Sequence, residues 1–452
     1  MKKEIPLKDR SLRHQIFSIA WPAAMESLFI GVIELADMTM VSSLGLAAVA
    51  AVGVTSQPRR ILLMFILALN VGATALVSRR IGENRPEDAN HCMHQFLLLS
   101  ILLSFVLYLC GFLFARPFML ISGADAEYLD DAVIYFRVIV VGQFLQAISL
   151  TVNSCLRAAG KTRVTFHTNV AANLVNLTFN YFLIYGKCGF PRLEIEGAAI
   201  ATSLGCLTAL LISLWSVRKQ AGGVLFLQIK KSYWTWDSTM IKGIAPVINS
   251  AFQEQLFQRL GLFIYARLAA SLGTDAFALY NFIMNIANLQ GYTYDGFAVT
   301  ATSLTGQNLG AQDPDRAEQS TKITLRMSYW TAAVITVLLI LGRPLILGIF
   351  SHESCIVLEG SRLMLFVAIS CIPCAGSATY AGALRGAGET KPVARYTLFS
   401  TAIFRPALAW LLCYPFHMYQ LGVWIAFFSG HTIRWLLMLH RYQKGTWRNI
   451  KL

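Results

Sequence analysis

Long apolar stretches, separated by short polar loops, repeat along the whole 452-residue chain. A helix needs about 20 apolar residues to cross about 30 Å of hydrocarbon, and each stretch is long enough. Backbone groups in lipid must be hydrogen-bonded internally, and no alternating barrel pattern is present, so the stretches are predicted to be helices. We place twelve spans at residues 14–41, 49–78, 93–115, 131–155, 164–186, 196–217, 240–268, 276–306, 322–349, 357–383, 394–416 and 420–440.

Composition and the placement of charge indicate an integral membrane protein. Hydrophobic residues make up 56% of the chain and charged residues 14%, whereas about a quarter of a soluble protein is charged. The formal net charge is +14, but the basic residues lie in short loops and form no aromatic-interleaved patch, so no nucleic-acid partner is expected. The loops at 79–85 and 157–163 are basic, and the loop near 123–131 is acidic. By the positive-inside rule, the chain is predicted to be a multi-pass protein of the cell membrane with both termini in the cytoplasm.

The two halves of the chain repeat each other at a nearly fixed spacing. GATALVSRRIGENRPEDA at 72–89 aligns with TATSLTGQNLGAQDPDRA at 300–317 without a gap, and LRAAGKT from Leu156 aligns with LRGAGET from Leu384 at the same offset. Six helices in each half place the two halves around an axis along the membrane normal, with a cavity between the bundles. We predict an N-lobe at 1–217, a cytoplasmic linker at 218–239 and a C-lobe at 240–452.

Polar side chains lie on single faces of several predicted spans. Glu26, Glu34 and Asp37 share one face of the first span at 100° per residue. A carboxylate at the centre of a bilayer costs about 3 kcal/mol on insertion scales, so ionisable groups within spans point to function. Amides join helices in many membrane proteins, but the stripes together with the acids favour a lined cavity. The stripes are Asn169, Asn173, Asn176 and Asn180 in the fifth span, and Asn281, Asn285, Asn288, Tyr292 and Asp295 in the eighth.

Other patterns narrow the function further. Arg59 and Arg60 lie early in the second span; they are structural if they pair with acids, and they favour an anionic or zwitterionic cargo if both face the cavity. No Walker loop is present, so ATP is not the energy source within this chain. No clustered nucleophile and no set of metal ligands is visible, so we expect no enzyme activity, no metal and no cofactor.

The chain resembles the multidrug and toxic compound extrusion (MATE) family over roughly residues 12–442. The resemblance rests on Pro22 and Asp37 in the first span, on the doubled loops GENRPEDA and GAQDPDRA, and on the doubled LRAAGKT and LRGAGET. It implies an all-α membrane protein with the MATE fold, in which twelve transmembrane helices form two pseudo-symmetric six-helix bundles. It also implies a secondary active antiporter that exports small organic compounds, mainly amphipathic cations, in exchange for H⁺ or Na⁺. We expect a monomer in the lipid bilayer.

The resemblance also assigns roles to individual residues. Loss of water favours the neutral form of a buried carboxyl group, so Asp37 is expected to bind the coupling ion. Ion binding would then weaken the contacts of Asp37 and let the first helix bend at Pro22, where a backbone hydrogen bond is missing. The expected ion-coupling residues are Asp37, Asn153, Asn176, Asn180, Thr202 and Glu254. The expected substrate cavity contains Glu34, Arg59, Arg60, Asn285, Asn288 and Asp295.

Two other transporter classes are alternatives. A flippase or exporter of a lipid-linked, anionic or zwitterionic metabolite in the same superfamily commonly has helices beyond twelve and a strongly cationic cavity, and Arg59 and Arg60 keep this alternative open. A major-facilitator transporter also has two six-helix halves, but SRRIGENRPEDA at 78–89 does not fit its Gly-Asp-Arg loop. The helix-ten aspartate of NorM-like members falls on Cys374, which argues against a NorM-type cation site in the C-lobe.

Overall fold

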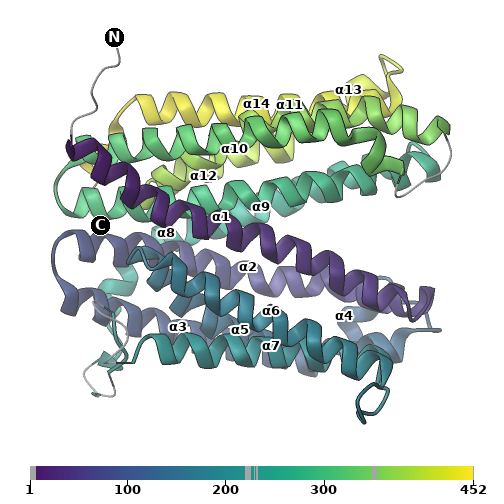
Figure 1. The fold of residues 1–452 in the computed structure, drawn as a ribbon, viewed down its shortest axis with the longest axis horizontal. Helices are drawn as coiled ribbons and strands as arrows, with labels where there is room; N and C mark the ends of the chain where they lie inside the picture. The colour runs from purple at the N-terminus through teal and green to yellow at the C-terminus, as the bar shows by residue number, and fades with distance from the viewer. Residues whose placement is uncertain (1–6, 219–224, 229, 231–232, 349–353, 451–452) are drawn as a thin grey trace. The chain divides into compact units, whose positions relative to one another are not determined.

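The computed structural model describes residues 7–218, 225–228, 230, 233–348 and 354–450, and every regular element in them is helical (Figure 1). The elements are α1 (Leu7–Ser42), α2 (Leu46–Gly82), α3 (Pro86–Leu113), α4 (Ala115–Ile121), α5 (Leu129–Ala158), α6 (Thr162–Tyr185), α7 (Glu194–Ser216), α8 (Ser238–Ala270), α9 (Thr274–Gly310), α10 (Pro314–Gly348), α11 (Ser354–Gly386), α12 (Thr390–Thr397), η2 (Leu398–Phe404), α13 (Arg405–Cys413), α14 (Tyr419–Gln443) and η3 (Thr446–Asn449).

The helices confirm the all-α prediction, and each predicted span contains a long helix. The eleventh span is a continuous run of α12, the π-helix η2 and α13, and α4 is a short helix that the hydropathy pattern did not predict. Eight spans among the described residues are long and apolar enough to cross a membrane by length and composition. Helices α1, α6, α8 and α9 are not among these eight. In α1 the stretch Ile16–Gly31 counts only as a shorter apolar helix, and α6, α8 and α9 carry amide or charged side chains within their spans.

The turns between helices repeat in the two halves of the chain. Only three residues separate α1 from α2, α2 from α3, α8 from α9, and α9 from α10. Gly45 and Gly273, which correspond at the offset of the repeat, precede α2 and α9 with φ of 106° and 113°, a region that glycine enters without steric cost. Asn84 and Gln312 correspond at the same offset, and both have φ of 58°. The internal repeat is therefore a repeat of backbone geometry as well as of sequence.

The chain folds as two compact units. The N-terminal unit is Met25–Ile248, and the C-terminal unit is Met1–Ala24 together with Asn249–Leu452. The divisions fall within α1 and α8, in each case two residues after a proline, Pro22 or Pro246. A proline inside a helix removes one backbone hydrogen bond and favours bending there.

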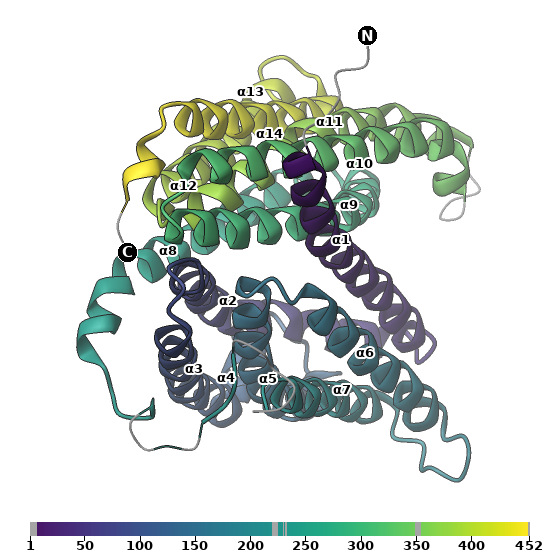
Figure 2. The same cartoon turned by 60° about the vertical axis from the view of Figure 1, so that its left-hand side comes forward.

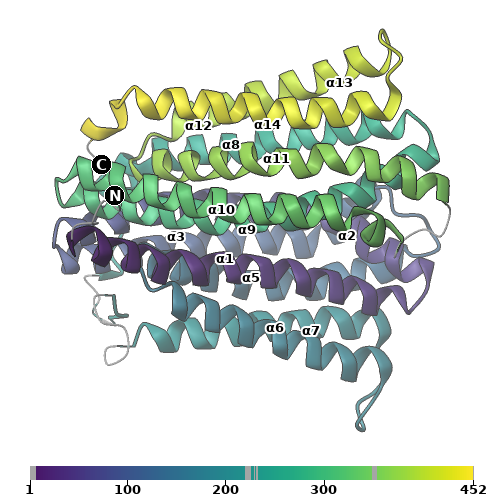
Figure 3. The ribbon, with the colours of Figure 1, turned by 45° about the horizontal axis from the view of Figure 1, so that its top comes forward.

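Each unit is built around one central helix. In the N-terminal unit α5 contacts α2, α3 and α7, and α6 packs against α7; Figure 2 shows α3, α5 and α7 side by side. In the C-terminal unit α11 contacts α9, α10 and α14, and α13 packs against α14 (Figure 3). The buried cores include Phe136 and Ile139 of α5 in one unit, and Met364 and Val367 of α11 in the other. The equivalent helices of the two halves thus make equivalent contacts.

Close packing of α8 against η2 depends on Gly261. A Cβ at this position would lie 2.7 Å from the carbonyl carbon of Thr401 and 3.0 Å from the Cα of Ala402. Gly261→Ala is therefore expected to destabilise the protein by about 1–3 kcal/mol through overpacking, measured as a lower thermal unfolding midpoint in detergent. Gly291→Ala in α9 is the matched control, because nothing lies within 4 Å of a Cβ there. Equal midpoints for the two variants would contradict this account of the contact.

Candidate ion-coupling site

Asp37 of α1 lies against the amide stripe of α6. The Nδ2 of Asn180 donates to Oδ1 of Asp37 at 2.8 Å. The surrounding groups orient the Asn176 amide so that its nitrogen donates to the two Asp37 carboxylate oxygens at 2.9 and 3.1 Å, and its oxygen lies 3.1 Å from Oγ1 of Thr202 on α7. Four of the predicted ion-coupling residues therefore form one hydrogen-bonded group within the N-terminal unit.

Local sequence explains how these side chains meet. Asn176 and Asn180 are four residues apart on α6, so they lie on the same face of the helix. Both side chains are buried, whereas Leu174 and Tyr181 of the same helix are exposed. Gly205 of α7 permits the close approach of α6, since a Cβ there would lie 3.1 Å from the Cβ of Asn176.

The amide of Asn180, whose nitrogen donates to Asp37, has an unpartnered oxygen. The Oδ1 of Asn180 is buried and accepts no hydrogen bond from any described residue. A buried amide oxygen without a donor costs free energy, about 1–3 kcal/mol, unless a donor or a cation binds it. Carboxylate and amide oxygens are hard ligands that suit H⁺, Na⁺ or another small cation.

Asn153 of α5 belongs to a different polar group. Its Oδ1 accepts a hydrogen bond from Ser213 at 3.1 Å, and its Nδ2 lies 3.5 Å from the hydroxyl of Ser149. These hydrogen bonds connect Asn153 with α5 and α7 rather than with Asp37, and its expected role in ion coupling stays a prediction. Rotation along α5 turns Asn153 toward α7 at Ser213.

Glu26 forms a buried ion pair that sequence reasoning did not assign to any site. The side chain is 5% exposed, and its carboxylate accepts hydrogen bonds from Arg157 at 3.0 Å, Thr165 at 2.9 Å and Asn169 at 2.5 Å. The internal repeat could have identified this ion pair from the sequence. At its constant offset Glu26 corresponds to Glu254, and Arg157 corresponds to Arg385.

Glu254 of α8 lies in the C-terminal unit, where two arginines hold it. Arg385 binds both of its oxygens, with Nε at 3.1 Å and Nη2 at 2.5 Å, and Nη2 of Arg434 lies 3.2 Å away. Glu254 is 2% exposed. Two such partners stabilise the ionised carboxylate, and the expected role of Glu254 in coupling stays a prediction.

The residues expected to line a substrate cavity lie in both units. Asn285, Asn288 and Asp295 are all exposed on one face of α9, in the C-terminal unit. In the N-terminal unit Arg60 is exposed, and Arg59 is half-buried near the hydroxyl of Tyr135, which also lies near Asp37. The side chain of Glu34 lies outside the described residues.

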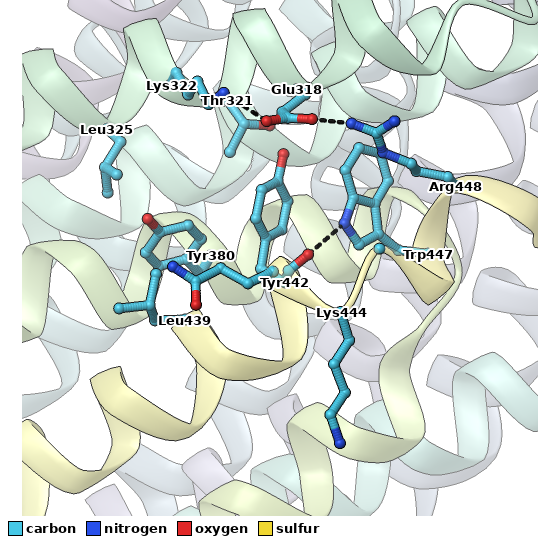
Figure 4. Close-up of a pocket in the computed structure, with 12 residues that line it drawn as sticks. Glu318, Thr321, Lys322, Leu325, Tyr380, Leu439, Tyr442, Lys444, Trp447 and Arg448 are labelled. Carbon is cyan, nitrogen blue, oxygen red and sulfur yellow. Dashed lines mark hydrogen bonds and ion pairs between the residues drawn. The ribbon is translucent and has the colours of Figure 1, made fainter.

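A pocket of about 580 Å³ lies elsewhere in the C-terminal unit, between α10, α11, α14 and η3 (Figure 4). The indole N–H of Trp447 donates to the Tyr442 carbonyl at 2.9 Å, and the two rings stack with centroids 4.9 Å apart. Arg448 and Glu318, which both line the pocket, form an ion pair. None of the residues predicted for ion coupling or substrate binding lines this pocket, so it is separate from the candidate site.

Comparisons with known proteins agree with the fold. Residues 22–182 and 251–411 match the MatE family model. The chain is 23% identical over 446 residues to the probable multidrug resistance protein NorM of Thermotoga maritima, covering 99% of this chain and 94% of that protein. It is 27% identical over 295 residues to the FAD transporter of Shewanella oneidensis, covering 65% of this chain and 64% of that protein. A crystal structure of a MATE protein in complex with MaL6 superposes with a TM-score of 0.90 at 20% identity, covering 97% of this chain and 98% of that one. Two matched stretches that span most of the chain, together with this architecture, show that the protein is a membrane transporter and belongs to the MATE family.

Proposed function

We propose that the protein is a secondary active antiporter that exports amphipathic organic cations in exchange for H⁺ or Na⁺ bound at Asp37. The observation that carries this proposal is the Asp37 carboxylate, which accepts hydrogen bonds from the amides of Asn176 and Asn180, together with the buried Oδ1 of Asn180, which has no partner among the described residues. The carboxylate of Asp37 provides negative charge, and the amide oxygen of Asn180 provides an unused lone pair on a buried side chain. The similarity to a probable multidrug resistance protein supports the export of drug-like organic compounds.

Ion binding changes the contacts that hold α1. A proton or Na⁺ on Asp37 neutralises the charge that attracts the amide groups of Asn176 and Asn180, so both hydrogen bonds weaken. The part of α1 that carries Asp37 is then free to move about Pro22, where the helix lacks one backbone hydrogen bond. Loss of the ion restores the contacts, and this cycle couples ion entry to cargo export.

Transport in proteoliposomes tests the proposal. Purified protein is reconstituted, a proton gradient or a sodium gradient is imposed separately, and the movement of a fluorescent organic cation is followed. We expect one of the two gradients to drive cargo accumulation, and dissipating that gradient with an ionophore to stop it. Cargo movement that is indifferent to both gradients would overturn the proposal.

An anionic or zwitterionic cargo is the second candidate. Two observations favour it, namely the position of Arg59 near the hydroxyl of Tyr135 and the similarity to an FAD transporter. The same vesicles loaded with a flavin nucleotide distinguish the candidates, because gradient-driven export of the anion without export of the cation would select the second.

We also propose the arrangement of the chain in the membrane. The N-lobe is 1–217, the linker is 218–239 and the C-lobe is 240–452, with both termini in the cytoplasm and the protein acting as a monomer. Part of the linker packs on α3, since the backbone N–H of Phe226 donates to Asn90 at 2.7 Å and that of Gln228 to His94 at 2.9 Å. Labelling of single cysteines at the termini by an impermeant reagent, in intact and in opened cells, tests the orientation.

A further inference from the structure

The C-terminal unit contains a counterpart of the close approach that positions Asn176. A Cβ at Gly205 of α7 would lie 3.1 Å from the Cβ of Asn176 and 2.9 Å from the carbonyl oxygen of Ala172. A Cβ at Gly430 of α14 would lie 3.2 Å from the Cβ of Arg405 and 3.4 Å from the carbonyl oxygen of Ser400. Arg405 therefore takes the place of Asn176.

The π-helix accounts for a shift in the repeat at this point. Ala172 and Asn176 are four residues apart, whereas Ser400 and Arg405 are five apart, and the additional residue lies in η2. A π-helix turn contains one residue more than an α-helix turn, and such turns are frequent at functional sites. The constant offset of the repeat would match Asn176 with Phe404, and the insertion places Arg405 there instead.

Two further correspondences concern the acid and the hydroxyl that contact Asn176. Asp37 follows Glu26 in α1 by the same number of residues as Tyr265 follows Glu254 in α8, so Tyr265 takes the place of Asp37. Thr202 lies three residues before Gly205 in α7, and Phe427 lies three residues before Gly430 in α14. Phe427 therefore takes the place of Thr202.

These three counterparts meet in the C-terminal unit as the originals meet in the other. The guanidinium carbon of Arg405 lies 4.9 Å from the ring centroid of Phe427 and 5.6 Å from that of Tyr265. Arg405 is 3% exposed, its Nε has no hydrogen-bond partner, and no acid forms an ion pair with it among the described residues. The faces of the two aromatic rings, which are electron-rich, stabilise its charge instead. The Tyr265 hydroxyl is used elsewhere, as a donor to the Val423 carbonyl.

We propose that the positively charged guanidinium group of Arg405 replaces a bound ion in the C-terminal unit. It lies at the place that is equivalent to the ion site of Asp37. In the N-terminal unit the carboxylate of Asp37 can bind a diffusible cation, whereas in the C-terminal unit the faces of two aromatic rings lie around a guanidinium that is part of the chain. A second coupling ion is repelled by this fixed charge and finds no carboxylate there. Glu254, the buried acid of the C-terminal unit, is already paired with Arg385 and Arg434, so we infer that the protein binds one coupling ion per molecule, in the N-terminal unit. This inference rests on the proposed function, because it concerns the same coupling ion.

Counting bound ions tests the inference. The protein is purified in detergent, and radioactive Na⁺ binding and the uptake of protons from a weakly buffered solution are measured per molecule. We expect one ion for the wild type, none for Asp37→Asn and one for Arg405→Lys, which keeps a fixed charge. Two ions for the wild type, or one for Asp37→Asn, would overturn the inference. Absence of gradient-driven transport would instead overturn the proposed function, so the two failures are distinguishable.

Two further variants examine Arg405 itself. The double variant Tyr265→Asp/Arg405→Asn rebuilds the acid and the amide of the other unit, and it is expected to raise the count from one ion to two. An unchanged count in the folded double variant would contradict the equivalence of the two places. If this variant does not fold, the ion counts for the wild type and Asp37→Asn decide.

Arg405→Met tests whether Arg405 binds cargo instead. A tenfold or larger loss of cargo affinity that Arg405→Lys restores would make Arg405 a cargo-binding group and overturn the inference.

Discussion

Asp37→Asn is expected to reduce gradient-driven export to the level of protein-free vesicles. The substitution keeps the size of the side chain and its ability to accept hydrogen bonds from Asn180, but it removes the charge that an ion neutralises. The side chain at position 37 is then neutral with or without the ion. The ion therefore does not bind one conformation of the protein more tightly than another, and it cannot shift the equilibrium between them. The measurement is cargo accumulation in proteoliposomes under the driving gradient, together with binding of the cargo at equilibrium.

Two controls make this result specific. Asp131→Asn, at an exposed position in the first turn of α5, removes the same charge outside the site and is expected to leave export unchanged. The thermal unfolding midpoint of Asp37→Asn is expected to stay near that of the wild type. Wild-type export by Asp37→Asn would remove Asp37 from the mechanism.

Glu254→Gln is expected to destabilise the protein by about 3–5 kcal/mol, because it leaves Arg385 and Arg434 in a buried place without their carboxylate. The expected observation is a large decrease in the thermal unfolding midpoint in detergent. Glu26→Gln is the matched variant in the other unit; it leaves one arginine, Arg157, and is expected to cost less. Replacing Glu254 and Arg385 together by leucine is expected to recover part of the loss, since one of the two unpaired guanidinium groups is removed.

A second outcome of the Glu254 experiment bears on mechanism. If Glu254→Gln retains the wild-type unfolding midpoint and loses export, the ion pair is not chiefly structural and Glu254 takes part in coupling, as the family resemblance implies. If both the midpoint and export are retained, the ion pairs of Glu254 with Arg385 and Arg434 contribute little to stability, and the expected destabilisation is wrong.

Much of the architecture was predictable from local sequence. The length and apolarity of the spans determine that they form helices in a membrane, because lipid offers the backbone no hydrogen-bond partners. The repeat of GENRPEDA and GAQDPDRA indicated two equivalent halves. In the structure each loop contains one residue in the left-handed conformation, Asn84 or Gln312, shortly before a helix that begins with proline. The helical spacing of Asn176 and Asn180 indicated a shared face, because that spacing is a local property of the helix.

Contacts between helices needed the tertiary structure. Sequence spacing did not indicate that Asn153 turns toward Ser213, or that Arg385 and Arg434 both reach Glu254, because rotation and approach of separate helices depend on packing along their whole lengths. The π-helix η2 is a further case, since one additional residue rotates everything after it and hides Arg405 from an alignment at constant spacing.

The sequence by itself determined the helical membrane fold, its internal duplication and the presence of an acid in α1, since these depend on composition, periodicity and repetition along one chain, and its motifs carried the resemblance to the family. Only the tertiary structure decided which amides bind Asp37, which arginines hold Glu254 and which residue of the C-terminal unit stands at the equivalent of the ion site. The physical reason is that hydrogen bonds and ion pairs between helices require side chains to meet within about 3 Å, and that distance depends on helix packing rather than on sequence spacing.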